Sequence, residues 1–189
     1  PFKPSIQTTN KRKHNFYNIL ICCGGAGRPS SIDFFKIMKK IVNKFEILDN
    51  SVKFTLILGN SKEKFKSSNL NTLKWSKNFS KLVTEHDLII SEAGYFTMVE
   101  LLFSDIISII IPGDRRIDNQ EIRSVRMEKF GFGYFYFPME NWRIIFKKII
   151  EIKKNKTKSL QKSKAEAYKN IFIKPNKNIK TEIIKLLND

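Results

Sequence analysis

The segment from Gly94 to Glu100, GYFTMVE, combines residue types that suit the recognition of phosphate and of hydroxyl groups. Gly94, Tyr95 and Phe96 open a predicted helix, where backbone amides and the helix dipole favour an anion. Thr97 adds a hydroxyl, and Glu100 places a carboxylate inside an otherwise apolar helix. Such a carboxylate can accept two hydrogen bonds from a diol such as that of ribose. The competing interpretation is an ordinary exposed helix glutamate.

A glycine-rich turn, Gly24-Gly25-Ala26-Gly27, follows an apolar run and precedes a second predicted helix. Glycines allow a sharp turn and let a ligand approach the backbone amides at a helix N-terminus. The spacing is neither that of the dinucleotide fingerprint nor that of the P-loop. A plain tight turn between a strand and a helix therefore stays an alternative.

Asn119 and Gln120 follow a charged loop and stand at the start of another predicted helix. Side-chain amides both donate and accept hydrogen bonds, which suits sugar hydroxyls. As isolated amides they would be unremarkable. Their spacing from Glu100 makes them candidates for the same site.

The elements that must position these residues follow from the apolar pattern. Nearly continuous apolar runs bounded by turn residues predict buried strands at 18–23, 52–58, 72–75, 88–90, 106–111 and 134–137. Helical spacing predicts a helix capped by Ser30 or Ser31, a short one near 79–83, one after Gly94, one from 120 to 130, and further ones at 141–153, 163–171 and 179–187. This alternation predicts a Rossmann-like α/β three-layer sandwich with a parallel sheet.

In that architecture the candidate residues share one edge of the sheet. The glycine turns, a helix N-terminus, Glu100 and the Gln120 amide all follow strands at their carboxyl ends. That edge is where α/β sheets bind ligands. A ligand with a diphosphate in the middle and hydroxyls at both ends fits this order, and a nucleotide-sugar has that form.

Length and composition limit the number of domains and the cellular location of the protein. The 189 residues, 41% of them hydrophobic, can bury the core of one domain, and the sequence contains no apolar run near the roughly 20 residues that span a bilayer. Cys22 and Cys23 are adjacent and so point to opposite faces of a strand, which makes them poor disulfide partners. A reducing, cytoplasmic location is the simplest interpretation.

Other chemistry finds little support. His14 and His86 have no evident nucleophile or acid partner, and the aromatic rings of Trp75 and Trp142 are expected in the core. No His, Cys, Asp or Glu cluster has metal-ligand spacing, so we expect no metal and no cofactor.

The net charge of +17 is compatible with an anionic partner, either nucleic acid or a membrane surface. From Arg143 to Asp189 there are 14 Lys and Arg against 4 Asp and Glu. A lysine-rich, Asn- and Ile-rich composition also gives such a charge without any partner, and this is the favoured interpretation. Nucleic acid is the less favoured of the two partners.

The segment around Glu100 resembles the C-terminal domain of family 28 glycosyltransferases, which is one half of a GT-B fold. The resemblance covers about 18–137. It rests on an Asp before a strand, an Ala-Gly turn, a Thr, a Glu, a Pro after the next strand and a Gln in the following loop. These are Asp87, Ala93, Gly94, Thr97, Glu100, Pro112 and Gln120.

The resemblance implies roles for these residues. Gly24, Gly25, Ala26 and Gly27 would face the diphosphate of a UDP-sugar such as UDP-N-acetylglucosamine. Backbone groups around Ser76 would hold the uracil edge, and Gly94, Tyr95, Phe96 and Thr97 would carry the phosphates. Glu100 would bind the ribose hydroxyls, and Asn119 with Gln120 would hold the donor sugar.

It also implies what this chain lacks. Residues 1–17 correspond to an interdomain linker and 18–189 to the donor-binding domain, whose predicted helices from 160 to 189 contact an N-terminal acceptor domain or a partner subunit. That half would supply the general base, so no catalytic residue is assigned here. The transfer would invert the anomeric carbon, with helix dipoles rather than a metal stabilising the leaving diphosphate. The sequence departs from the family at Asp105-Ile106-Ile107 and at Arg123-Ser124.

Two alternatives stay open. A nucleotide-sugar hydrolase or epimerase shares this half-domain and differs in its acid and base residues. A basic module for RNA or for an anionic membrane would instead use the lysines near the C-terminus, and would bind polyanions with a steep salt dependence.

Overall fold

The computed structural model describes residues 15–23, 29–102, 104, 106–113, 119–129, 134–136 and 141–155. Within these residues strands and helices alternate along the chain. In order they are β1 (Tyr17–Cys22), α1 (Pro29–Leu48), β2 (Val52–Ile57), β3 (Leu70–Leu73), α2 (Phe79–Thr84), β4 (Leu88–Ser91), α3 (Tyr95–Leu102), β5 (Ile107–Ile110), α4 (Gln120–Lys129), β6 (Tyr134–Tyr136) and α5 (Trp142–Asn155).

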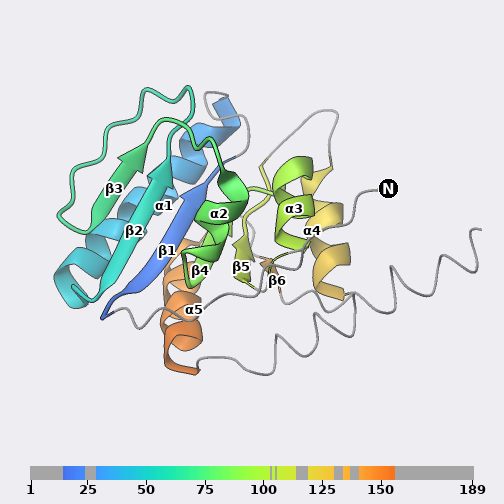
Figure 1. Ribbon diagram of the computed structural model, residues 1–189. Helices are drawn as coiled ribbons and strands as arrows, with labels where there is room; N and C mark the ends of the chain where they lie inside the picture. Colours follow the sequence, from blue (N-terminus) through green and yellow to red (C-terminus); the bar gives the residue numbers. More distant parts are fainter. Residues whose placement is uncertain are drawn as a thin grey trace, which may run out of the picture.

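The strands form one parallel sheet in the order β3-β2-β1-β4-β5-β6, as Figure 1 shows. The chain moves outward from β1 to β3 and then returns to the other side of β1 with β4. This order is that of the Rossmann fold, and its switch point lies between β1 and β4. The predicted Rossmann-like α/β class is therefore confirmed.

The two strands at the switch point are buried along most of their length. In β1 the residues Ile19, Leu20 and Ile21 are fully buried, and β4 is buried throughout. The register pairs Cys22 of β1 with Ser91 of β4. Both strands consequently end at the same level of the sheet.

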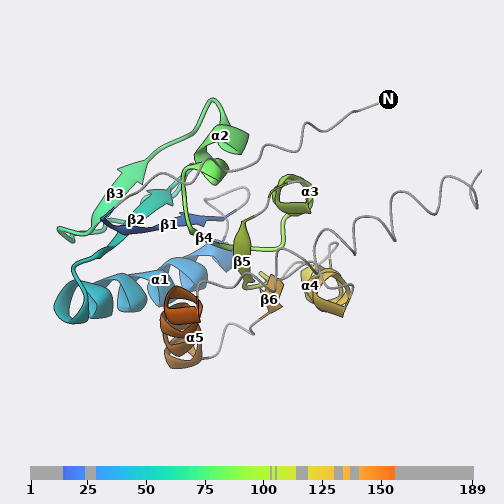
Figure 2. The same ribbon diagram turned by 60° about the horizontal axis from the view of Figure 1, so that its bottom comes forward.

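Helices cover both faces of the sheet (Figure 2). One core cluster joins α1 and α5 to one face, and a second joins α2 and α3 to the other. In α1 the apolar residues recur every three or four positions, so that Phe35, Met38 and Phe45 all point inward. The ring of Phe45 lies 5.7 Å from that of Phe54 in β2 and 4.6 Å from that of Phe146 in α5.

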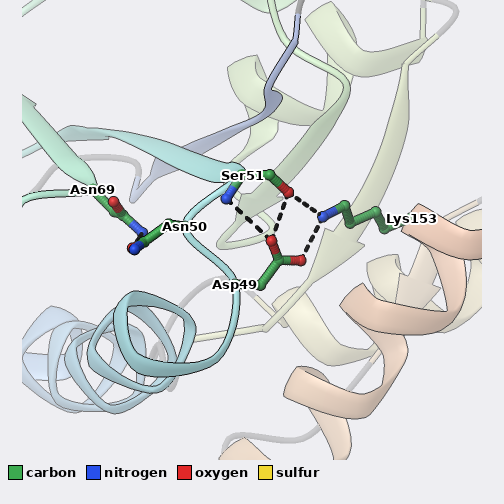
Figure 3. Close-up of polar contacts among 5 residues, drawn as sticks. All are labelled: Asp49, Asn50, Ser51, Asn69 and Lys153. Carbon is green, nitrogen blue, oxygen red and sulfur yellow. Dashed lines mark hydrogen bonds and ion pairs between the residues drawn. The ribbon is translucent and has the colours of Figure 1, made fainter.

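A polar cluster fixes the end of α5 against the turn between α1 and β2 (Figure 3). The Lys153 Nζ atom donates to the Asp49 carboxylate at 2.5 Å and to the Ser51 hydroxyl at 2.7 Å. The backbone N–H and the hydroxyl of Ser51 also donate to Asp49. The cluster lies at the end of the sheet opposite to the carboxyl ends of the strands.

The structure corrects two of the predicted boundaries. The helix α1 begins at Pro29, so Ser30 and Ser31 lie in its first turn instead of capping it, in keeping with the preference of proline for the first helical position. The strand β3 covers Leu70–Leu73 and not 72–75. Its partner β2 ends just before Gly59, whose positive φ of 60° turns the chain away.

The side chain of Trp75 is therefore not in the core. It lies beyond the end of β3 and is 57% exposed, contrary to the expectation from its size and apolarity. Trp142 is half-buried and packs against the core, as expected. The helices predicted at 163–171 and 179–187 and most of the linker at 1–17 lie outside the described residues.

Candidate functional site

The candidate site lies at the carboxyl edge of the sheet, next to the switch point. After β4 comes the turn Glu92–Gly94 and then α3, while β5 is followed by Pro112 and Gly113. The helix α4 begins at Gln120. Residues Gly24, Gly25, Ala26 and Gly27 lie outside the described residues, so their predicted role stays a prediction.

The N-terminus of α3 lies at this edge, with the backbone amides of its first turn. The backbone N–H of Met98 donates to the Gly94 carbonyl at 2.9 Å, so Gly94 takes the first helical hydrogen bond. The amides of Tyr95, Phe96 and Thr97 in the first turn consequently have no helical acceptor. The side chain of Thr97 is half-buried and that of Tyr95 is 63% exposed. This end of α3 can bind an anion through its amides and its dipole.

Glu100 is exposed and held in place by a second helix. The hydroxyl of Ser80 in α2 donates to its Oε2 atom at 2.7 Å. A carboxylate has acceptor capacity for about four hydrogen bonds, so this contact leaves room for a ligand. Glu100 thus lies one turn after the N-terminal amides of α3, and its predicted role toward a diol stays a prediction.

The loop that carries Ser76 leads directly into α2. Ser76 is half-buried, and the side chain of Asn78 caps the helix by accepting a hydrogen bond from the Lys81 amide at 2.9 Å. Because Ser80 contacts Glu100, the loop after β3 and the helix α3 are brought together. Trp75, exposed in the same loop, adds a flat apolar surface.

Gln120 is 2% exposed, and a backbone amide holds its side-chain oxygen. Its Oε1 atom accepts a hydrogen bond from the Gly113 N–H at 2.9 Å, and the buried Nε2 atom has no partner. The hydroxyl of Ser124 donates to the Gln120 carbonyl at 2.7 Å. The Nε2 hydrogens of Gln120 are therefore its unpaired donors, while Oε1 keeps one lone pair beyond its bond to Gly113.

Asn119 has a structural role that its residue type alone does not reveal. It is exposed, and its Oδ1 atom accepts a hydrogen bond from the Ile122 N–H at 2.9 Å. This is an N-terminal cap for α4. The predicted contact with a sugar stays a prediction, and it would use the side-chain nitrogen.

Three residues at this edge were missed by the sequence analysis as parts of the site. Ser80 positions Glu100. Arg123, noted only as a departure from the family pattern, donates from Nη1 to the Ala93 carbonyl at 2.6 Å and lies over the ring of Tyr95 at 5.8 Å. Glu92 is fully buried against Gly113. No periodicity signals such residues, because their roles depend on contacts between elements far apart in the sequence.

Other reactive groups nearby are poorly suited to catalysis. Burial raises the pKa of the Cys22 thiol well above its usual value, and the neighbouring Cys23 adds to this effect, so the thiol stays protonated. Burial lowers the pKa of His86, whose Nδ1 atom lies 2.7 Å from the Leu82 carbonyl oxygen. Within the described parts of the chain, no group of three or more His, Cys, Asp and Glu residues is arranged to hold a metal.

Comparison with known proteins places the chain in a family. Residues 8–186 match the model of the glycosyltransferase family 28 C-terminal domain. The chain belongs to this family. A curated relative from Thermosipho africanus (strain TCF52B), UDP-N-acetylglucosamine–N-acetylmuramyl-(pentapeptide) pyrophosphoryl-undecaprenol N-acetylglucosamine transferase, is 30% identical over 183 residues. The match covers 95% of this chain and 51% of the relative, so the family 28 domain described here spans about half the length of that protein.

Solved structures of glycosyltransferases share the fold of this family 28 domain. MurG from Acinetobacter baumannii has a TM-score of 0.59 at 16% identity, covering 86% of this chain and 46% of that one. The spinosyn rhamnosyltransferase SpnG, solved with thymidine diphosphate, has a TM-score of 0.61 at 11% identity, covering 90% and 46%. Among the described residues, no helix is both long and apolar enough to cross a membrane.

Proposed function

We propose that this chain is the donor-binding half of an inverting, metal-independent glycosyltransferase. The donor is a UDP-sugar, UDP-N-acetylglucosamine or a close relative, and the enzyme is a hexosyltransferase. The acceptor is held by an N-terminal domain or by a partner subunit, which also supplies the general base. The half-domain alone binds donor and transfers poorly.

The observation that carries this proposal is the joint placement of three groups at one edge of the sheet. The first turn of α3 begins at Tyr95, the Glu100 carboxylate accepts a hydrogen bond from Ser80 one turn later, and the buried Gln120 has a side-chain nitrogen without a partner. These are a site for an anion, a carboxylate that can accept hydrogen bonds from a diol, and an amide that can donate to a hydroxyl. Together they match a diphosphate flanked by a ribose and a sugar. Membership of the family supports the same assignment.

The chemistry follows from this arrangement. An acceptor hydroxyl displaces the nucleoside diphosphate from the anomeric carbon, which inverts that carbon. Negative charge develops on the leaving diphosphate, and the amides and dipole of α3 stabilise it there. These groups supply the positive potential that the departing phosphate needs, so the proposed mechanism uses no divalent cation.

Two of the compared proteins support a nucleotide-linked donor. The name of the curated relative specifies UDP-N-acetylglucosamine, and SpnG was solved with thymidine diphosphate. The curated relative is 30% identical over nearly all of this chain, whereas SpnG is 11% identical. We therefore propose a uridine nucleotide in preference to a thymidine nucleotide.

Calorimetric titration tests the proposal. The chain is titrated with UDP, UDP-N-acetylglucosamine and thymidine diphosphate, with and without EDTA, beside Glu100→Ala and the exposed control Glu121→Ala. We expect uridine nucleotides to bind in EDTA, Glu100→Ala to abolish binding, and Glu121→Ala to leave it unchanged. Absence of binding by the folded chain would contradict the proposal. Release of free sugar from the donor would favour a hydrolase.

A further inference from the structure

Arg123 connects the two helices that border the proposed donor site. It lies in the first turn of α4, three residues after Gln120, so the two side chains leave the helix on the same side. Its Nη1 atom donates to the Ala93 carbonyl at 2.6 Å, and Ala93 stands two residues before the start of α3. The guanidinium group therefore lies at the N-terminal end of α3, although its backbone belongs to the helix that carries Gln120.

A second contact orients this long side chain. The guanidinium carbon of Arg123 lies 5.8 Å from the centre of the Tyr95 ring, within the range of a cation–π interaction. Arg123 is half-buried, whereas Arg126, one turn further along α4, is exposed. The guanidinium is a planar fork with five N–H donors, and the bond to Ala93 uses one of them. Arg123 is thus turned toward the α3 turn and not toward bulk solvent.

The charge of the α3 turn explains what a cation does there. Residues 92–102 contain two acidic side chains, Glu92 and Glu100, and no basic one. A helix dipole is equivalent to about half an elementary charge, and a nucleoside diphosphate carries more than one negative charge. The amides of α3 alone would leave most of that charge uncompensated. Arg123 brings a full positive charge to this turn, on a group that suits phosphate oxygens.

The positions of Glu100 and Gln120 indicate which phosphate Arg123 meets. In the proposed donor site the ribose lies at Glu100, which Ser80 of α2 holds, and the sugar lies at Gln120. The phosphate linked to the sugar is therefore the one nearer to Gln120 and α4. Arg123 extends from α4 to the N-terminal turn of α3, which is the path between the sugar and the phosphates.

We infer that Arg123 binds the sugar-linked phosphate of the donor, an inference that rests on the proposed function. During transfer the acceptor oxygen bonds to the anomeric carbon, and its proton goes to the general base of the other half. The bond from that carbon to the phosphate oxygen breaks, and its electron pair stays on the phosphate. Arg123 stabilises the charge that develops there. Because Arg123 is a position at which the sequence departs from the family, this role belongs to the present chain.

Calorimetric titration with UDP and UMP tests the inference, because UMP lacks the phosphate to which the sugar is linked. We expect Arg123→Gln to weaken UDP binding roughly ten- to hundredfold, the effect of losing a hydrogen bond to a charged group. Its UMP affinity should be little changed. Arg123→Lys keeps the charge without the planar fork, so it should lose less UDP affinity. Arg126→Gln removes the same charge from an exposed position of α4 and should leave both affinities unchanged.

The ratio of the UDP and UMP affinities separates phosphate binding from a structural role. Equal losses of UDP and UMP binding in Arg123→Gln would overturn the inference, because they would show that Arg123 acts by holding the Ala93 carbonyl. Equal effects of Arg123→Gln and Arg126→Gln would overturn it as well. Retained UMP binding shows that a variant is folded.

The same titrations distinguish failure of this inference from failure of the donor site. If the parent chain does not bind UDP, or if Glu100→Ala binds it equally well, the donor site itself is wrong and the inference falls with it. If Glu100→Ala abolishes UDP binding while Arg123→Gln keeps the parent's ratio of UDP to UMP affinity, the role of Arg123 alone is overturned.

Discussion

Ser80 and Glu100 are joined by a 2.7 Å hydrogen bond across 20 positions of sequence. The bond links α2 to α3, and so it fixes the one exposed carboxylate of α3 against the helix that follows the Ser76 loop. A long, exposed glutamate would otherwise sample several rotamers. In the proposed donor site, Ser80 therefore positions the group that receives the ribose hydroxyls.

Replacing Ser80 by alanine should weaken nucleotide binding without unfolding the domain. A hydrogen bond to a charged group is worth about 1.5–3 kcal/mol at most, and only the positioning part is lost here. We expect the Kd for UDP to rise about three- to tenfold in calorimetry, with Glu100→Ala losing more. Asn43→Ala, at an exposed position of α1, serves as the control. Equal affinity of Ser80→Ala and the parent chain would show that Ser80 does not position the carboxylate.

Gln120→Leu should destabilise the fold as well as the site. Leucine leaves the Gly113 N–H without its acceptor in a buried place, a loss of about 1–3 kcal/mol in the free energy of unfolding. Urea denaturation measures this loss. Ser124→Ala removes the neighbouring bond to the Gln120 carbonyl but keeps Gly113 paired, so a loss below about 1 kcal/mol is expected. A Gln120→Leu protein as stable as the parent would argue against a stabilising hydrogen bond between Gly113 and Gln120.

Much of the fold could be predicted because the signal was local. The apolar runs that became β1, β2 and β4 are continuous, as strands buried on both faces must be. The position of β3 was predicted two residues too late. Its ends are set by the ladder with β2, in which the Phe54 and Gly59 amides donate to the carbonyls of Asn69 and Lys74. That pairing is long-range, so the short polar segment itself contains no sequence signal for the ends of β3.

The candidate site was predictable in part for the same reason. Gly94, Thr97 and Glu100 belong to one segment, so their spacing could be recognised, whereas the roles of Ser80 and Arg123 arise only when three helices meet. Asn119 shows the converse. Its residue type suggested a ligand, and the structure gives its oxygen to a helix cap. An amide side chain has several uses, and sequence alone does not choose among them.

Gly113→Ala should be destabilising because of Glu92. A methyl group at position 113 would lie 3.1 Å from the Glu92 Oε1 atom and 3.2 Å from its carboxyl carbon, so the buried carboxylate would have to shift. Overpacking of this kind costs about 1–3 kcal/mol. Urea denaturation of Gly113→Ala, Glu92→Asp and the double variant separates the two effects. In the double variant, the shorter side chain of Glu92→Asp should reduce the loss of unfolding free energy that Gly113→Ala causes. Strictly additive losses in the two single variants would argue against the contact between positions 92 and 113.

The last prediction concerns the cluster in Figure 3 and its pH dependence. The hydrogen bond from Lys153, followed by that from Ser51, holds the pKa of Asp49 below its ordinary value of 3.8. A lowered carboxyl pKa stabilises the fold above about pH 4, and this contribution is lost as the pH falls through the folded-state pKa. The Asp49 side chain is 35% exposed, so solvent screening limits the contribution to about 1 kcal/mol or less.

Lys153→Met should therefore lower the free energy of unfolding at pH 7 by up to about 1 kcal/mol. The difference from the parent chain should shrink below pH 4 and vanish once Asp49 is protonated in both proteins. Lys154→Met, at the next and exposed position of α5, is the matched control and should show no such pH dependence. Urea denaturation at several pH values measures all three proteins. A Lys153→Met difference that persists at pH 2 would mean that the lysine stabilises α5 by packing its aliphatic chain, and not through Asp49.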